Sequence, residues 1–313
     1  MVKSDMASPK LSILLLCWNH ARFLKECIGS IARQTRQDFE IVFLDNVSTD
    51  GSFELAAQLF DRFGLTARMI RNEQPQSIPA NANRLLAASS GGIVAPLSTD
   101  DWYDEAYVET MLAAAGENPD ASWFSCSGWL FFDAEGRTEP FDETRIVADR
   151  PVSEVILAGG EPHFFVGCAY RRSALDAIGG WDENQLIEDR DLFLRLAQRF
   201  KHHRIAGRLV HYRRAGTTAS ANAKLMLEGW DRFFTKHAAL FGTQLTSQWA
   251  ECMRTNAALL IDQGHLRAAS KVLLKALTLK PLKLSTWRTL GYLGRAGLSR
   301  PLTRHFGGGS SQL

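Results

Sequence analysis

The chain has 313 residues, of which 45% are hydrophobic and 22% charged, and its formal net charge is +2. This composition excludes disorder for the chain as a whole, and the small net charge excludes nucleic-acid binding by the chain as a whole. Five cysteines without a CxxC pair indicate neither a disulfide framework nor a zinc site, so a reducing compartment fits best.

The N-terminal residues lack the apolar segment of a signal peptide. No stretch approaches the roughly 18 consecutive apolar residues that a membrane-spanning helix needs. We therefore expect a cytoplasmic protein.

Strands and helices are predicted to alternate from residue 11 to residue 97. The run Leu11 to Cys17 is short and apolar, as in a buried parallel strand, and one apolar stripe marks the segment after it as a helix. The expected strands are 11–17, 40–44, 67–70 and 93–97, and the expected helices are 21–34, 52–63 and 79–89. This alternation predicts an α/β fold built from βαβ units.

After Asp101 the alternation loosens into an α+β pattern. A turn is expected at Gly179-Gly180, and only helices are expected beyond His237, where we place a domain boundary. The expected helices of this half are 105–115 and 189–200, and its β-prone pieces are 122–126, 129–132 and 164–170.

Acidic residues follow predicted strands at two places and open a predicted helix at a third. Asp45 follows one strand, Asp100-Asp101 follows another, and Glu188-Asp189 lies at the start of a helix. Ligands bind at the carboxyl ends of parallel strands, which favours a functional role. Each cluster alone is equally compatible with a turn or a helix N-cap.

Taken in order, four segments carry a resemblance. They are LSILLLCWNHARFLKECIGSIARQ, EIVFLDNVSTDGS, ANANRLLAASSGGIVAPLSTDDW and GGWDENQLIEDRDLFLRLA. Together they resemble the inverting nucleotide-sugar glycosyltransferases of family 2, over roughly residues 10 to 215. The resemblance implies the type A glycosyltransferase (GT-A) fold, a Rossmann-like mixed sheet flanked by helices, here with a C-terminal α-helical extension.

The implied reaction transfers a hexose or N-acetylhexosamine from a nucleotide-diphosphate donor, expected to be a UDP-sugar. The acceptor would be a hydroxyl of a glycan or lipid-linked molecule, as in bacterial polysaccharide synthesis. The catalytic domain would span residues 1–237, with a nucleotide-binding half at about 10–101 and an acceptor half at about 102–237.

The resemblance also assigns a nucleotide site. A carboxylate such as Asp45 can accept hydrogen bonds from a uracil imide or a ribose hydroxyl. Asn83 and Arg84 fall where the family carries a polar pair, although an exposed helix face is the alternative. The implied nucleotide-binding residues are Cys17, Trp18, Asn19, Asp45, Asn83, Arg84 and Asp100.

The metal-binding motif departs from the family's fullest pattern, because Ser98 stands where many members have an aspartate. Asp100 and Asp101 remain as ligands for Mg²⁺ or Mn²⁺, which would neutralise the leaving diphosphate. We expect weaker metal affinity than a three-acid site would give. His211 is a further candidate ligand, with a structural histidine as the alternative, and the neighbouring Arg213 or Arg214 could pair with phosphate.

For inversion, a carboxylate must take the proton of the attacking hydroxyl. Asp189 is the implied base and Glu188 its neighbour, although Asp189 could merely cap the helix. Trp102, His163 and Trp181 are expected on the acceptor side, with core or turn positions as the alternative.

The C-terminal region is strongly basic. Residues 253–313 contain ten Lys or Arg and one acid, a net +9, whereas the residues before them carry −7. Residues 258–281 have the spacing of one tetratricopeptide unit within a basic helical extension, 238–306, and residues 307–313 read as a flexible tail. The extension could contact an anionic membrane at its inner face or a protein partner, or simply be a solvated face.

A second class of function remains open at this stage. Loss of an acid at Ser98 favours a degenerate transferase that acts as a scaffold or binding protein, whereas the intact acids oppose it. Nucleotidyl transfer leaves the Glu188-Asp189 element unexplained, and a dinucleotide oxidoreductase is disfavoured because no GxGxxG follows a strand.

Overall fold

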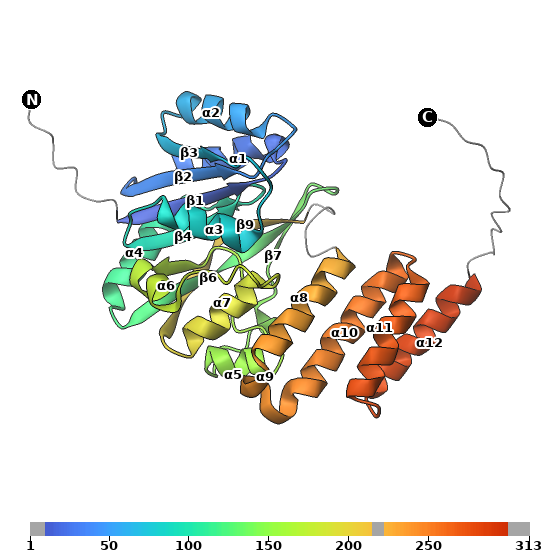
Figure 1. The fold of residues 1–313 in the computed structure, drawn as a ribbon. Coiled ribbons are helices and arrows are strands. Elements are labelled where there is room, and N and C mark those ends of the chain that lie inside the picture. The colour runs from blue at the N-terminus through green and yellow to red at the C-terminus, as the bar shows by residue number, and fades with distance from the viewer. Residues whose placement is uncertain (1–9, 215–221, 300–313) are drawn as a thin grey trace, which may run out of the picture. The chain divides into compact units, whose positions relative to one another are not determined.

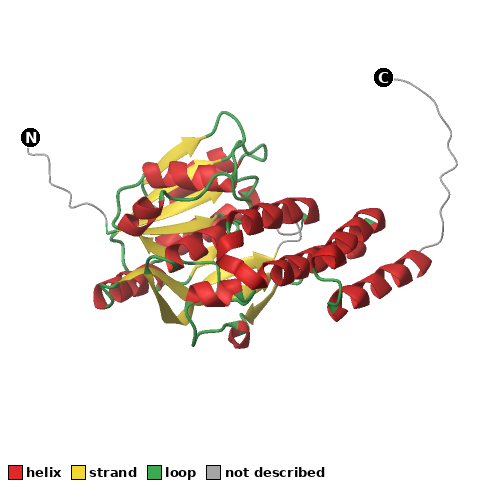
Figure 2. Cartoon of the chain, turned by 60° about the horizontal axis from the view of Figure 1, so that its bottom comes forward, coloured by secondary structure: helices red, strands yellow, loops and turns green. Residues whose placement is uncertain are grey.

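The computed structural model describes residues 10–214 and 222–299. The chain divides into two compact units, Met1–Thr218 and Ala219–Leu313. The described part of the first unit mixes strands and helices, and that of the second contains helices only (Figures 1 and 2). This division precedes the expected boundary at residue 237, because helix α8 (Ala223–Lys236) packs against α10 (Leu245–Asp262) within the second unit.

One nine-stranded mixed sheet organises the described part of the first unit, in the order β3-β2-β1-β4-β8-β6-β9-β5, with β7 paired to β6. The strands are β1 Leu11–Cys17, β2 Phe39–Asp45, β3 Ala67–Arg71, β4 Ile93–Ser98, β5 Trp102–Tyr103, β6 Ala121–Phe132, β7 Arg137–Pro140, β8 Ala169–Arg171 and β9 Lys201–Arg214. Strands β1 to β4 run parallel, so the carboxyl ends of β1, β2 and β4 meet at one edge. The remaining strands make the sheet mixed.

Helices flank this sheet (Figure 2). They are α1 Ala21–Ala32, α2 Ser52–Arg62, α3 Ile78–Ala87, α4 Tyr107–Glu117, α5 Val152–Leu157, α6 Arg172–Ile178 and α7 Glu188–Ala197, with a 3₁₀ turn at Glu143–Arg145. The apolar stripe of α1, including Leu24, Ile28 and Ile31, is fully buried in one cluster with Leu11, Ile13 and other strand residues. Burial of these apolar stripes holds the helices against the sheet, and so positions the edge at which the carboxyl ends of β1, β2 and β4 meet.

The second half of the sheet differs from the sequence expectation. Residues 121–132 form a single strand rather than two pieces, and of the β-prone run 164–170 only Ala169 and Tyr170 are in a strand. The long strand β9 was not expected. Its sequence, KHHRIAGRLVHYRR, is rich in charge, and only Ile205, Leu209 and Val210 are buried apolar residues, so no continuous apolar run marks it as a strand.

The second unit is built from α8 Ala223–Lys236, α9 Ala238–Phe241, a 3₁₀ turn at Gly242–Gln244, α10 Leu245–Asp262, α11 Leu266–Leu279 and α12 Leu284–Ser299. Helices α10 and α11 form the expected hairpin, turning at Gly264 with a positive φ of 82°. Small buried residues such as Ala250 and Ala276 let the two helices pack closely. The tail expected at residues 307–313 lies outside the described residues.

None of the helices in the described ranges combines the length and apolar character needed to cross a membrane.

Candidate active site

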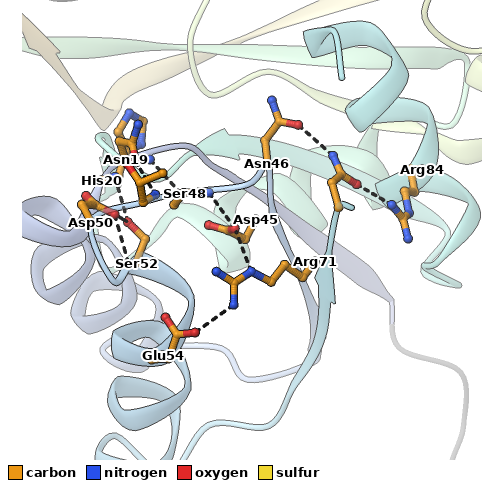
Figure 3. Close-up of polar contacts among 12 residues, drawn as sticks. Asn19, His20, Asp45, Asn46, Ser48, Asp50, Ser52, Glu54, Arg71 and Arg84 are labelled. Carbon is orange, nitrogen blue, oxygen red and sulfur yellow. Dashed lines mark hydrogen bonds and ion pairs between the residues drawn. The ribbon is translucent and has the colours of Figure 1, made fainter. Parts of the chain in front are cut away.

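Asp45 ends β2 and is completely buried. Its Oδ1 accepts a hydrogen bond from the Ser48 amide at 3.0 Å and lies 3.7 Å from Nε of Arg71, which also pairs with Glu54 at 2.8 Å (Figure 3). Its Oδ2 is buried without a hydrogen-bond partner in the described structure. A buried carboxylate oxygen normally has a donor, so this atom is suited to a ligand N–H or O–H.

The turn after β1 is bonded to the turn after β2. Asn19 adopts a positive φ of 55°, its amide donates to Ser48 Oγ at 2.8 Å, and its Oδ1 accepts from the Thr49 amide at 2.8 Å (Figure 3). Cys17 is buried and contributes its carbonyl, which accepts from the Asn46 amide. Trp18 is 59% exposed, so its indole is accessible for stacking on a planar ring.

A chain of side-chain amides continues from Asn46. Asn72 donates to Asn46 Oδ1 at 2.8 Å, and Arg84 donates to Asn72 Oδ1 (Figure 3). Arg71, Asn72, Asn81 and Arg84 line a polar cavity of about 460 Å³. Arg84 is therefore linked through Asn72 and Asn46 to the edge that carries Asp45, and its side chain lines a polar cavity.

Asn83 points elsewhere. Its Nδ2 donates to the Trp181 carbonyl at 2.8 Å and to Glu183 at 3.0 Å, and its Oδ1 accepts from the Trp181 amide at 2.9 Å. Both amide hydrogens are thus used inside the protein. The nucleotide contact expected for Asn83 gives way to a structural one: Asn83 holds the turn that precedes α7.

The acids after β4 have different surroundings. Asp101 is 4% exposed, its Oδ1 accepts from the Arg213 amide at 2.8 Å, and burial together with Asp100 raises its pKa well above the usual range. Asp100 is partly exposed, and its Oδ1 has no hydrogen-bond partner within the described chain. Asp100 thus has a carboxylate oxygen suited to a cation, whereas Asp101 is engaged in holding β9.

The described residues contain no group of three or more His, Cys, Asp or Glu side chains arranged to hold a metal. A lone carboxylate still fits Mg²⁺ or Mn²⁺, because such ions commonly bind through one or two carboxylates, substrate phosphates and water. Asp100 fits that pattern. Ser98 is exposed beside it and offers only a hydroxyl.

His20 was missed by the sequence analysis. Its Nδ1 lies 2.9 Å from Thr99 Oγ1 and 3.9 Å from Asp100 Oδ1, and its backbone amide donates to Ser52 Oγ. Burial lowers its pKa, although the Asp100 charge opposes that shift. Only the position of His20 directly after Asn19 could have signalled it, since a lone histidine has no motif of its own.

Pairing of β5 with β9 places His211 opposite Trp102. Their rings stack at 4.7 Å between centroids, so both side chains lie on one face of the sheet. His211 Nδ1 is buried without a partner within the described residues. Burial lowers the pKa of His211. A neutral imidazole with a spare nitrogen is compatible with metal ligation, which remains a prediction.

Arg213 is not available for a phosphate. It is 5% exposed, its Nη1 pairs with Asp133 at 2.6 Å, its Nη2 pairs with Glu26, and its Nε donates to the Asp100 carbonyl at 2.9 Å. The guanidinium instead holds the segment after β4 against α1.

Glu188 and Asp189 form the first turn of α7 and line a cavity of about 290 Å³. The same cavity is lined by Ser98 and Asp101 from the end of β4 and by the 6% exposed Trp181. Burial and the Asp189 charge raise the pKa of Glu188 to about 8, and burial raises the pKa of Asp189. The structure therefore brings two of the three acidic clusters to one cavity.

Asp189 does not occupy the N-cap of α7. That position belongs to Ile187, which makes no side-chain cap, while Asp189 Oδ1 accepts from the Arg190 amide at 2.6 Å. A carboxylate in the first turn interacts favourably with the helix dipole but leaves its second oxygen for other contacts.

His163 lies beside the same carboxylate. His163, Asp189 and Arg190 line a second cavity of about 100 Å³. The His163 Nδ1 donates to the Phe164 carbonyl, its Nε2 is buried without a partner in the described structure, and burial lowers its pKa to about 4. His163 is therefore neutral at pH 7 and lines the same small cavity as Asp189.

Comparison with known proteins identifies the family. The sequence pattern of Glycosyl transferase family 2 matches residues 12–179, more than half of the chain, so the chain belongs to this family. Among curated relatives, EpsH, a glycosyltransferase-type protein of Bacillus subtilis (strain 168), is 28% identical over 178 residues, which are 55% of this chain and 50% of EpsH. EpsE of the same organism is 27% identical over 192 residues, 60% of this chain and 67% of EpsE. The chain thus spans half the length of EpsH.

Solved structures confirm the GT-A-like fold. Residues 1–349 of S. aureus TarS in complex with UDP-GlcNAc align with a TM-score of 0.61 at 14% identity, covering 92% of each chain. The mannosyltransferase PcManGT from Pyrobaculum calidifontis, in complex with GDP-Man and Mn²⁺, aligns with a TM-score of 0.61 at 16% identity, covering 94% of this chain and 87% of that one. At such identities the likeness concerns the fold.

Proposed function

We propose that this chain is an inverting glycosyltransferase that moves a hexose or N-acetylhexosamine from a UDP-sugar to a hydroxyl of a glycan or lipid-linked acceptor. The observation that carries the proposal is the cavity shared by Ser98 and Asp101 with the carboxylates Glu188 and Asp189. Family membership supports the donor class, as do the nucleotide-sugars bound to two structural neighbours, UDP-GlcNAc and GDP-Man.

The nucleoside would bind at the edge formed by β1 and β2. The orphan Oδ2 of Asp45 would accept from the base or ribose, Trp18 would stack on the base, and Asn19 and Arg84 would shape the site. Cys17 would contribute only through its backbone. UDP is proposed over GDP because of the resemblance, and the experiment below discriminates between them.

Asp100 would hold a Mg²⁺ or Mn²⁺ ion, with His211 as a further ligand. When bound, this ion neutralises negative charge on the diphosphate of the donor. Asp101 would act indirectly, by keeping β9 and the Asp100 segment together.

Asp189 would act as the general base. As the acceptor oxygen forms a bond to the anomeric carbon, the bond from that carbon to the diphosphate oxygen breaks, and the acceptor proton passes to Asp189. Burial raises the pKa of Asp189, which makes it a better proton acceptor than an exposed aspartate once it is ionised, and the pKa of Glu188, about 8, keeps that neighbour protonated at neutral pH. Trp102, His163 and Trp181 would border the acceptor.

The test is a thermal-shift titration with UDP, GDP and dTDP, each with Mn²⁺ and with chelator. A bound nucleotide raises the melting temperature in proportion to ln(1 + [L]/Kd), so about 100-fold excess over Kd adds roughly 2.7 kcal/mol. We expect UDP to stabilise the protein most, and only with Mn²⁺. Asp100→Asn should abolish the Mn²⁺ dependence, whereas Asp61→Asn, an exposed acid on α2, should retain it.

Two outcomes would overturn parts of this proposal. Stabilisation by GDP or dTDP rather than UDP would change the donor, and full stabilisation in chelator would remove the metal. No response to any nucleotide would favour a scaffold protein on a transferase fold, for which Ser98 is the supporting feature.

A further inference from the structure

The turn between α11 and α12 exposes apolar side chains beside basic side chains. We call residues 280–288 the basic apolar turn. Within it Leu282 is 95% exposed, Leu284 63% and Trp287 54%. Figure 1 shows this turn at the end of the helix pair opposite the α10–α11 turn. Large exposed apolar side chains gathered in one short segment mark an interaction surface.

The basic apolar turn is ordered by its own contacts. The Trp287 indole donates a hydrogen bond to the Pro281 carbonyl at 2.8 Å, and Thr286 is completely buried. The amides of Lys283 and Thr286 donate to the carbonyls of Lys280 and Lys283. The apolar side chains are therefore held outward by a fixed backbone.

The charge around the turn has one sign. Residues 263–296 contain seven Lys or Arg and no Asp or Glu. Lys275 pairs with Asp231 at 2.9 Å and Lys283 pairs with Glu251 at 2.7 Å. Within the described residues, Lys280 and Arg288 have no carboxylate partner.

Helical spacing places apolar and basic side chains together on one face of α12. Leu284, Trp287 and Arg288 stand at positions i, i+3 and i+4, so they share a face. A tryptophan beside leucines and a cation is the composition of a helix that lies in a membrane interface, with the indole at headgroup level and the cation at the phosphates.

We propose that the basic apolar turn docks this protein onto an anionic lipid bilayer, with Leu282, Leu284 and Trp287 entering the headgroup–acyl boundary. Lys280 and Arg288 contact the lipid phosphates. The positive charge favours an anionic bilayer as the partner. An apolar groove on a protein would fit the leucines, but it would not explain why all the charged residues around the turn are basic. The docking is independent of the donor site, whose residues all precede residue 215.

The experiment is co-sedimentation of the full chain with vesicles of phosphatidylcholine alone or with about one third phosphatidylglycerol. We expect binding to the anionic vesicles only, weakening as salt is raised. Lys280→Gln with Arg288→Gln should lower the partition coefficient about 25-fold, at about fivefold per charge. The control Arg267→Gln removes an exposed charge at the other end of α11, about 20 Å away along the helix, and should change it less than twofold.

The apolar part is tested by Leu282→Ser with Leu284→Ser, for which we expect at least about a tenfold loss. Leu240→Ser, at a 40% exposed leucine of α9, is the matched control. All variants change exposed residues of the second unit, and the far-UV circular dichroism spectrum and its thermal melt check that the helices of each variant remain folded.

Failure of wild type to bind either vesicle, or equal binding to both, would overturn the proposal and favour a protein partner. Full binding by the leucine variant would overturn the insertion of the turn. An unchanged UDP response in the same samples would show that the transferase proposal is unaffected.

Discussion

At the scale of single residues, the carboxylates Glu188 and Asp189 have the unusual chemistry. They are adjacent, both withdrawn from water, and line one cavity, so ionising the first makes ionising the second more costly. This arrangement is unfavourable for folding unless a proton is retained. Such a cost is typical of residues kept for a reaction rather than for stability.

Asp189→Asn tests the base directly. The amide keeps the shape and can still accept from the Arg190 amide, but it cannot take a proton. We expect turnover to fall about 10²- to 10⁴-fold with UDP binding unchanged. The measurement is the rate of UDP release with donor and acceptor, and Glu154→Gln, an exposed acid in the first turn of α5, is the control. Near-wild-type turnover of Asp189→Asn would reject the assignment.

Glu188→Gln should change how stability depends on pH. The pKa of Glu188 is about 8 in the folded chain, whereas that of an exposed glutamate is 4.5. Because the folded pKa is raised, the contribution of Glu188 is fully favourable below pH 4.5 and is lost as the pH rises toward 8. The glutamine cannot ionise, so the variant should gain roughly 2 kcal/mol on wild type between pH 5 and pH 9, after allowance for partial solvent access.

Urea denaturation of both proteins at the two pH values measures this difference. A constant difference in the free energy of unfolding across that range would mean that Glu188 is not protonated in the folded chain.

The sequence predicted these acids but not their individual roles. Asp45, Asp100 and Glu188-Asp189 were found because turn and strand positions are local properties. The saturation of Asn83 by Trp181 and the burial of Arg213 depend on residues about a hundred positions away, and no local pattern encodes them. His20 was missed for the same reason, since its partner Thr99 lies in the turn after β4, 79 residues away in the sequence.

At the scale of elements, the unexpected strand β9 completes the site. It pairs with β5 and β6, brings His211 against Trp102, and donates the Arg213 amide to Asp101. The early βαβ units were predictable because each strand is a continuous apolar run. Bulges interrupt the pairing of β9, and its buried and charged residues do not alternate regularly. The two-residue periodicity that marks a strand is therefore absent from its sequence.

Arg213→Met tests this element. Methionine keeps an apolar stem between the rings of Phe23 and Trp102 but removes the cation that pairs with Glu26 and Asp133. Asp133 then keeps only Arg22, at 3.8 Å. Both carboxylates are partly exposed and can be rehydrated, so the loss is that of hydrogen bonds to charged groups, about 2 kcal/mol in the free energy of unfolding. Arg214→Met, at the exposed neighbouring residue, should stay within about 0.5 kcal/mol. Equal effects of the two substitutions in urea denaturation would contradict the anchoring role of Arg213.

At the scale of the whole molecule, each unit has a core of its own. The principal cluster of the first unit extends from Leu11 to Val210, and the clusters of the second contain Ala223, Leu260, Met253 and Ala276. All candidate site residues lie in the first unit. The alternation of strand and helix followed by helices alone predicted two parts, whereas assigning α8 to the second part required knowing that it packs on α10.

Separate cores predict two calorimetric transitions, of which UDP with Mn²⁺ shifts only one, because a ligand stabilises the unit that binds it. Two core variants assign the transitions. Leu24→Ala removes a fully buried side chain of α1, and Leu273→Ala removes one of α11. Each should cost about 2–5 kcal/mol and lower only the transition of its own unit. If UDP or either variant moved both transitions together, the units would unfold as one cooperative body, and the helical extension would then contribute to the stability of the site itself.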